Sequence, residues 1–139
     1  PSSGVIYVDT SPLIYTVERH PDYFALLDPL WAASESGQIQ VISSEMILLE
    51  TLTGALKRND PQLIADYERV LTASEMNLIP ITSALLRDAA RLRASVNIKT
   101  PDAIHAATAV ASGCTLLITN DRDLKRVTLL NVIILSEIV

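Results

Sequence analysis

Short apolar runs alternate along this chain with longer segments whose apolar residues recur every three or four positions. Runs of four or five residues are typical of strands buried on both faces, and the longer spacing is typical of helices packed on one side. We expect strands at residues 4–8, 39–42, 78–81, 115–118 and 131–135, with helices between them. Strands that alternate with helices predict an α/β fold with a mostly parallel sheet covered on both faces.

Several helix starts are marked by Ser, Thr or Asp, the residues that best satisfy free backbone N–H groups there. The expected capping residues are Ser11, Ser43 or Ser44, Asp60 and Thr82. Pro80 in the third expected strand cannot donate a ladder hydrogen bond, which predicts that this strand lies at an edge of the sheet or ends early.

Residues 100–124 combine a helix start, a helix rich in small residues, a helix stop and a strand. We expect Thr100 to cap a helix whose first turn holds Asp102, where the helix dipole favours a carboxylate. Gly113 is expected to end that helix. Asp121 follows the carboxyl end of the next strand, at the edge where open α/β sheets place ligand sites. The stretch therefore directs two carboxylates toward one place.

Two further acids are expected at the same edge of the sheet. Asp9 ends the first strand, and the helix after the second strand contains Glu45 and Glu50, either of which could face the edge. Carboxylates packed together repel one another, so they need a cation or a shared proton. Oxygen ligands without His or Cys favour Mg²⁺ or Mn²⁺ over zinc. Such ions support phosphodiester hydrolysis, because they activate water and stabilise the leaving oxygen.

Composition narrows the setting. The 139 residues are expected to form a single domain spanning 1–139, and the 49% of hydrophobic residues include no run of membrane-spanning length and no visible signal peptide. The lone Cys114 suits a reducing cytoplasm. The net charge of −5 argues against a protein that coats nucleic acid. It is unevenly placed, with four Lys/Arg against eleven Asp/Glu in residues 1–80 and seven against five in 81–139.

Four motifs occur in an order and at separations that resemble a PIN domain, in particular the small stand-alone toxins of VapBC toxin–antitoxin pairs. They are Val-Asp-Thr-Ser at 8–11, Ile-Ser-Ser-Glu-Met-Ile-Leu-Leu-Glu at 42–50, Pro-Asp-Ala-Ile-His-Ala-Ala-Thr-Ala at 101–109, and Leu-Ile-Thr-Asn-Asp-Arg-Asp-Leu at 117–124. The resemblance implies a three-layer α/β/α fold and an endoribonuclease that depends on Mg²⁺ or Mn²⁺. It also implies RNA as substrate, a cognate antitoxin as partner, and a homodimer.

The resemblance implies four catalytic metal ligands, Asp9, Glu50, Asp102 and Asp121. Glu45 is the rival of Glu50, but it lies in the first turn of its helix, where it would serve the helix dipole. The four acids bring like charges close together in the folded chain but not in the unfolded one. We therefore expect their pKa values to be raised in the fold and the metal-free protein to be destabilised at neutral pH.

Other residues near these acids are candidates for supporting roles. The resemblance implies that Thr10 and Thr119 orient a carboxylate or a metal-bound water, and Asp123 is a possible accessory acid. His105 shares a helical face with Asp102, and we favour packing or a hydrogen bond over general-base catalysis for it. The candidate phosphate-binding residues are Lys99, Arg122 and Lys125.

Three other interpretations compete with the nuclease. A phosphoacceptor receiver domain would carry a second acid beside Asp9 and a lysine at the end of its last strand, and a haloacid-dehalogenase-type phosphatase would carry Asp at position 11, which is Ser11. A PIN-like or receiver-like acidic pocket could also act as a non-nuclease binding or signalling module. The presence of all four acids favours the nuclease.

Overall fold

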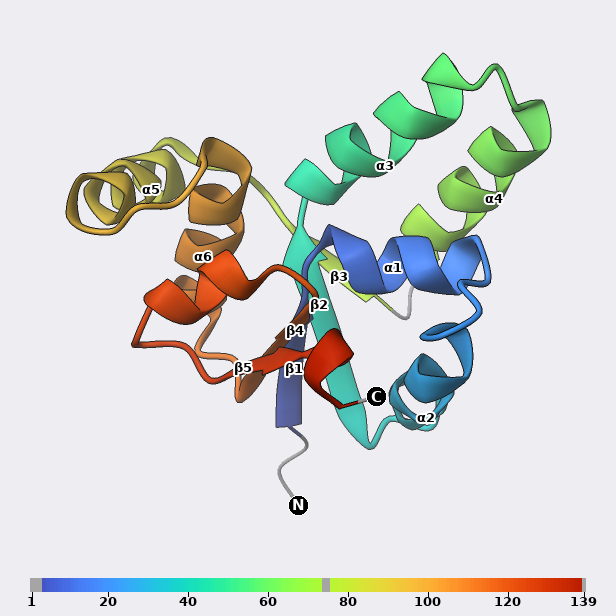
Figure 1. Ribbon diagram of the computed structural model, residues 1–139, viewed down its shortest axis with the longest axis horizontal. Coiled ribbons are helices and arrows are strands. Elements are labelled where there is room, and N and C mark those ends of the chain that lie inside the picture. The colour runs from blue at the N-terminus through green and yellow to red at the C-terminus, as the bar shows by residue number, and fades with distance from the viewer. Residues whose placement is uncertain (1–3, 74–75, 139) are drawn as a thin grey trace.

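A five-stranded sheet forms the centre of the molecule (Figure 1). The computed structural model describes residues 4–73 and 76–138. The sheet has the spatial order β3-β2-β1-β4-β5, and every neighbouring pair is parallel. Its strands are β1 (Gly4–Val8), β2 (Ile39–Ser44), β3 (Met76–Ile79), β4 (Leu116–Thr119) and β5 (Val132–Ile134). Because β1 is central, its carboxyl end is flanked by those of β2 and β4.

Helices cover both faces of this sheet. Figure 1 shows α5 and α6 on one side and α1 to α4 on the other, so the predicted three-layer α/β/α architecture is confirmed. No helix in the described ranges is long and apolar enough to cross a membrane. The helices are α1 (Thr10–Val17), α2 (Phe24–Glu35), α3 (Met46–Lys57), α4 (Pro61–Leu71), α5 (Ser83–Ser95) and α6 (Thr100–Ser112), with short 3₁₀ helices η1 (Arg122–Arg126) and η2 (Leu135–Glu137).

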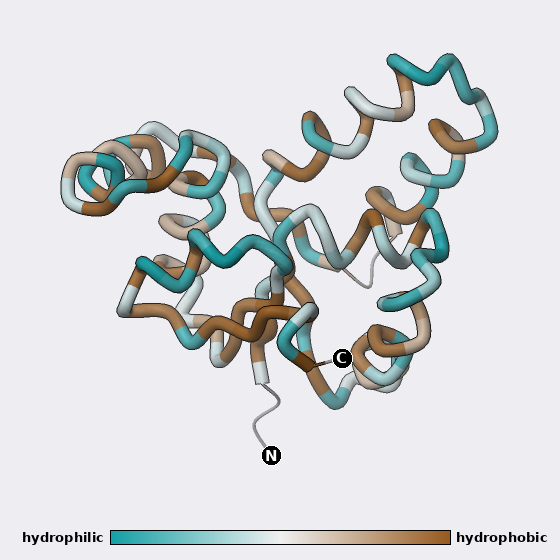
Figure 2. Tube along the Cα trace, in the orientation of Figure 1, coloured by the Kyte–Doolittle hydropathy of each residue, from teal (hydrophilic) through white to brown (hydrophobic). Residues whose placement is uncertain are grey.

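Successive residues of the central strands face opposite layers. Tyr7 packs in the core beneath α5 and α6, whereas Val8 packs with residues of α1, α3 and α4. In β2, Ile42 and Val41 divide between the same two cores. Because both faces are covered, apolar residues follow one another along these strands, which explains the runs in the sequence. Figure 2 shows the apolar stretches gathered along the sheet.

Small side chains let α6 lie close to the sheet. Ala103, Ala106 and Ala109 are fully buried, and Ala107 is 3% exposed. The helix ends, as predicted, at Gly113, whose φ of 68° lies in the left-handed region that only glycine adopts without strain. The start of α6, and with it Asp102, is therefore held close to the sheet.

The starts of α1 and α6 differ from the prediction by two residues and one residue. Asp9, not Ser11, caps α1, and its carboxylate accepts a hydrogen bond from the backbone N–H of Ser11. In α6, Lys99 occupies the cap position and Thr100 is already helical. The Thr100 hydroxyl instead accepts a hydrogen bond from the Arg93 guanidinium. At both helix starts the side chain expected to cap the helix, Ser11 or Thr100, instead forms a hydrogen bond with a neighbouring side chain.

The remaining ends follow the predicted chemistry. β3 is an edge strand, as Pro80 suggested, and it ends immediately before that proline. The strand Met76–Ile79 therefore lies two residues earlier in the chain than the expected 78–81. Asp60 and Thr82 cap α4 and α5 through hydrogen bonds from the backbone N–H three residues on. The start of α3 is the exception: Glu45 occupies the cap position expected for Ser43 or Ser44, although the Ser44 hydroxyl still accepts from the N–H of the first residue of α3.

Candidate functional site

An open pocket of about 450 Å³ lies at the edge of the sheet where the parallel strands end. It is formed by the end of β1, the starts of α1 and α6, the first half of α3 and the loop after β4. The acids expected from the sequence line it together with Thr10 and Arg122: Asp9, Glu50, Asp102 and Asp121. Four carboxylates that are far apart in the sequence thus converge because parallel strands end on one side.

Asp9 is the most buried of these acids, with 6% of its surface exposed. Its Oδ1 accepts hydrogen bonds from the backbone N–H and the hydroxyl of Ser11, at 3.3 and 3.0 Å, and its Oδ2 accepts one from the Thr119 hydroxyl. Burial raises the pKa of Asp9, and the proximity of His105 and these hydrogen bonds oppose the rise. Thr119 also accepts from the backbone N–H of Asp121 at 2.9 Å, so one hydroxyl positions two acids.

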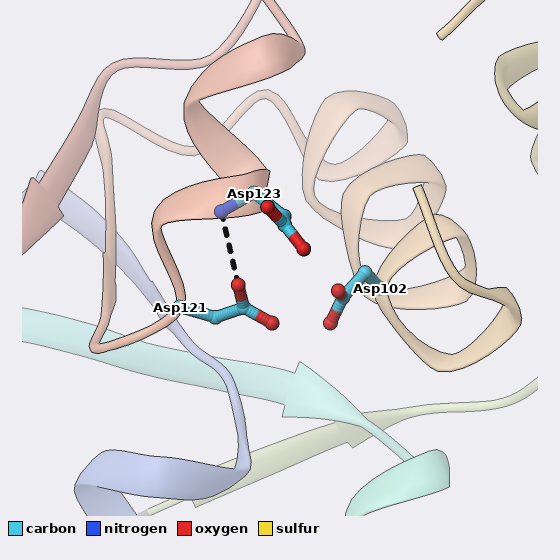
Figure 3. Close-up of side chains that lie close together, drawn as sticks. All are labelled: Asp102, Asp121 and Asp123. Atoms are coloured by element: carbon cyan, nitrogen blue, oxygen red, sulfur yellow. Dashed lines mark hydrogen bonds between the residues drawn. The ribbon is translucent and has the colours of Figure 1, made fainter. Parts of the chain in front are cut away.

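Asp102, Asp121 and Asp123 form a tight group (Figure 3). Each offers a carboxylate oxygen, and these oxygens lie within 4.8 Å of one another. Asp102 comes from the first turn of α6, and the other two from the start of η1, where the Asp123 N–H donates to Asp121 Oδ1 at 2.9 Å. Burial, the neighbouring Asp121 and the charge of Asp9 together raise the pKa of Asp102 to about 7.

The geometry of this group suits a divalent cation. Oxygen ligands lie roughly 2.0–2.6 Å from Mg²⁺ or Ca²⁺, so oxygens that share one ion are at most about 4–5 Å apart. The oxygens of Asp102, Asp121 and Asp123 fall within that limit. A cation would also relieve the repulsion that raises the pKa of Asp102. Asp123, expected only as an accessory acid, stands as close to this position as the other two.

Glu50 is held differently from the other acids. Its Oε1 accepts hydrogen bonds from the Thr10 hydroxyl and from His105 Nε2, both at 2.6 Å. Burial alone would raise the pKa of Glu50, but the hydrogen bonds from His105 and Thr10 outweigh it, and the pKa is lowered. The expectation that all four pKa values are raised is therefore wrong for Glu50, because hydrogen-bond donors rather than carboxylates surround it.

His105 is buried between Glu50 and Tyr7, with 2% of its surface exposed. The Tyr7 hydroxyl lies 2.7 Å from Nδ1, and the two rings meet edge to face at 5.8 Å. Because a carboxylate can only accept, Nε2 carries the proton toward Glu50, and in the neutral ring Tyr7 donates to Nδ1. His105 thus makes the hydrogen bonds that were favoured over a general-base role, and it holds Glu50 toward the pocket.

Glu45 lies outside this arrangement. It is exposed at the start of α3, and its carboxylate accepts a hydrogen bond from the backbone N–H of Ile81 at 3.3 Å. Glu50 lies on the turn of α3 that lines the pocket. Of the two rival glutamates, the structure brings Glu50 and not Glu45 to the other acids.

The three candidate phosphate-binding residues are placed unequally. Arg122 lines the pocket, and its guanidinium is 3.8 Å from the carboxylate of Glu137. Lys125 forms a closer ion pair with the same carboxylate, at 2.7 Å. Lys99 is exposed at the start of α6 and does not line the pocket. Exposed ion pairs contribute only about 0–1 kcal/mol, so a phosphate can displace them.

Three pocket residues were not singled out by the sequence. Ser11 was assigned to a helix cap, but its hydroxyl both donates to Asp9 and accepts from the backbone N–H of Asn120 at 3.1 Å. The Asn120 side chain in turn donates to the Tyr15 hydroxyl at 3.1 Å. The only signal in the sequence was the adjacency of Ser11 and Asn120 to the predicted acids; nothing pointed to Tyr15.

A comparison with protein-family models finds a match to the PIN domain over residues 6–130. No curated protein sequence matches the chain. The match spans β1 to the loop before β5 and includes every candidate acid.

Solved structures with the same fold are similar over nearly their whole length. VapBC2 from Rickettsia felis, bound to a DNA fragment from its promoter, has a TM-score of 0.72 at 20% identity, covering 93% of this chain and 97% of that one. A toxin–antitoxin complex from Klebsiella pneumoniae gives 0.64 at 23%, covering 96% and 98%. VapBC-5, of the VapBC family of toxin–antitoxin systems, from Mycobacterium tuberculosis gives 0.61 at 22%, covering 96% and 99%. At such identities the likeness establishes the shared fold.

Replacing Asp102 with Asn should stabilise the metal-free protein. The pKa of about 7 in the fold exceeds the unfolded value near 3.9, so the folded state binds more protons between these values and loses stability as pH rises from about 4 to 7. Above pH 7 the full penalty is present. Asp102→Asn removes the part of it that survives solvent screening of this half-buried group, adding at least about 1 kcal/mol and raising the melting temperature by about 2–8 °C. Thermal melting in EDTA at pH 5 and pH 8 measures this.

The exposed Asp22, changed to Asn, is the matched control and should melt like the parent at both pH values. Added Mg²⁺ should raise the melting temperature of the parent more than that of Asp102→Asn, because it binds only the folded form. A variant that melts below the parent at pH 8 in EDTA would show that Asp102 is not held under repulsion.

Proposed function

This chain belongs to the PIN domain family, and from that premise we propose that it is an endoribonuclease that hydrolyses RNA phosphodiester bonds with Mg²⁺ or Mn²⁺. The observation that carries the proposal is the convergence of Asp9, Glu50, Asp102 and Asp121 on one open pocket. PIN domains are generally nucleases, and an acidic pocket of this kind needs a cation before it can receive an anionic substrate.

The proposed metal ligands are the oxygen-only set that magnesium and manganese prefer. Asp102, Asp121 and Asp123 would contact the ion directly, with Asp9 and Glu50 completing the acidic wall. A divalent cation bound there would polarise a phosphoryl oxygen and lower the pKa of a bound water.

The chain's own side chains keep this wall in position. The Thr119 hydroxyl holds the Asp9 carboxylate and the backbone of Asp121, so these two acids keep a fixed relation. Thr10 and His105 hold Glu50 in its ionised form, ready to act as an oxygen ligand or a proton acceptor. Arg122 at the pocket wall supplies positive charge for a substrate phosphate, and we assign Lys99 and Lys125 a weaker share of that attraction.

We propose further that the protein is the toxin of a type II toxin–antitoxin pair and acts in the cytoplasm, where its RNA substrate is found. The similar structures described as toxin–antitoxin complexes support this. So does a mostly apolar groove of about 570 Å³ between α1, α2 and α4, whose lining includes Leu13, Trp31, Val70 and Met76. An apolar antitoxin segment would fill the groove, and an antitoxin arginine would pair bidentately with the acids.

A homodimer completes the proposed assembly. Leu49 and Leu56 lie two turns apart on α3, on the same face of the helix, and are 64% and 58% exposed. Large apolar side chains exposed at helical spacing are typical of a helix that packs against a partner. We propose that a second copy of this chain covers them, with residues 1–139 forming one domain in each subunit.

The purified protein should cleave single-stranded RNA only when Mg²⁺ or Mn²⁺ is present. Asp9→Asn combined with Asp121→Asn should lower the rate at least about 10²-fold, equivalent to about 2.7 kcal/mol of transition-state stabilisation. Gel analysis of labelled RNA, with and without EDTA, measures this, and Asp88→Asn on α5 is the control outside the pocket. Full activity in excess EDTA, or in the double variant, would refute the metal-dependent mechanism, whereas RNA that stays intact under every condition would favour a binding module.

The two rival glutamates provide a matched pair. Glu50→Gln should remove most of the activity, because the side chain lies in the pocket and its charge is held by His105. Glu45→Gln should leave activity nearly unchanged, because Glu45 is exposed and bonded to the backbone of Ile81. Initial cleavage rates at saturating Mg²⁺ distinguish the two variants. If Glu45→Gln lost activity and Glu50→Gln kept it, the turn of α3 that holds Glu45 would be the one that faces the metal.

An antitoxin should report its binding through Trp31, the single tryptophan of the chain. Its ring lines the groove and its Nε1 donates to Thr16 at 2.8 Å, so a peptide packing there should change its fluorescence. Titration with a tryptophan-free antitoxin is the measurement. An inhibitory antitoxin that leaves Trp31 emission unchanged, and whose cross-links lie wholly away from Asp9 and Asp102, would contradict this mode of inhibition.

A further inference from the structure

Three aromatic rings form a cluster beside the acidic pocket: Tyr23 stacks on Tyr15 and on His20, whereas Tyr15 and His20 are tilted by 58° to each other. The ring centroids of Tyr15 and Tyr23 are 4.7 Å apart at an angle of 29°, and His20 lies 4.8 Å from each of them. Tyr15 belongs to α1, and the other two rings to the turn that leads into α2. All three are partly exposed, whereas Tyr7 and Tyr67, the remaining tyrosines, are buried in the two cores.

This cluster is connected to the pocket through Tyr15. The Tyr15 ring is part of the pocket wall, and its hydroxyl accepts a hydrogen bond from Asn120, the residue before Asp121. Asn120 also accepts from the backbone N–H of Ser136, so it is anchored on its other side. His20 Nδ1 accepts from the backbone N–H of Asp22 at 3.1 Å, which fixes the ring within the turn. The rings therefore have set orientations next to the acids.

The charge around the pocket explains why such rings would matter for RNA. Residues 1–80, which supply Asp9, Glu50 and the aromatic cluster, carry seven more acids than bases. Arg122 and Lys125 both face the carboxylate of Glu137. A phosphate must first displace these weak ion pairs, and acids outnumber bases in this part of the chain, so a further source of binding energy would strengthen the hold on an RNA strand. Stacking of a base on an aromatic ring supplies such energy without regard to charge or base identity.

We propose that Tyr15, His20 and Tyr23 form a stacking site for one unpaired base of the RNA, next to the phosphate that the acids receive. The inference rests on the proposed endoribonuclease function and adds a substrate requirement. A base held in a duplex cannot reach the rings, so the substrate must offer a single-stranded segment at the cleavage site.

Tyr23 gives the cleaner test, because Tyr15 also holds Asn120. Binding of a labelled single-stranded RNA oligonucleotide is measured by fluorescence anisotropy with Mg²⁺ present, with Glu50→Gln added to every protein tested so that little cleavage is expected. Tyr23→Leu should weaken binding about 5- to 150-fold, the equivalent of losing one stacked base. Tyr23→Phe and Tyr23→Trp, which keep an aromatic face, should bind within about threefold of the parent. Phe24→Leu, the neighbouring aromatic outside the cluster, should bind like the parent.

A duplex of the same sequence should bind parent and Tyr23→Leu equally weakly, and thermal melting should show that all variants are folded. Equal binding of the single strand by parent and Tyr23→Leu, with Mg²⁺-dependent cleavage by the parent intact, would overturn the stacking site and leave the nuclease standing. A parent that binds no single-stranded RNA but still cleaves it would do the same. A parent that neither binds nor cleaves RNA would overturn the proposed function as well.

Discussion

The position of Asp9 is the constraint on which the rest of the pocket depends. It ends the central strand and caps the helix that follows, so one side chain joins the middle of the sheet to the layer above it. A carboxylate buried there would be costly without partners. Ser11 and Thr119 provide them, and through Thr119 the loop after β4 is fixed at the same point. The acids from α3 and α6 then only need to reach a position already defined by the sheet.

The pocket holds its carboxylates in two opposite ways. Glu50 is surrounded by donors, with Thr10 and His105 contributing the hydrogen bonds that keep it ionised, and Tyr7 behind His105 orients the imidazole. Asp102 faces other acids, and its pKa is raised to about 7. One side of the pocket is thus a permanent negative charge, and the other is a charge that a proton or a cation must share. An acidic wall of this mixed kind can be neutralised either by a proton or by a cation.

The sheet, its layers and the convergence of the acids could be predicted from the sequence, because strand and helix periodicity and the rule that parallel strands end together are local or topological. The contacts among the acids could not. Asp123 lies close to Asp102 because η1 is a tight 3₁₀ turn, a conformation that could not be predicted from its sequence. Glu50 escapes repulsion through His105, whose orientation depends on Tyr7, and that pairing brings together residues 98 positions apart. Side-chain packing of this kind is decided by the tertiary fold.

The alanines of α6 have a consequence for how finely the pocket is adjusted. Ala103, Ala106 and Ala109 leave no space between helix and sheet, so they act as a spacer whose thickness is one methyl group. Functional groups at such sites must be held within about 0.5 Å, and a close-packed interior transmits even a one-carbon change in side-chain size. The distance between Asp102 and the acids that follow β4 is thus set by residues that do not line the pocket. Substitutions at these small, buried alanines would therefore shift Asp102 relative to the other acids of the pocket.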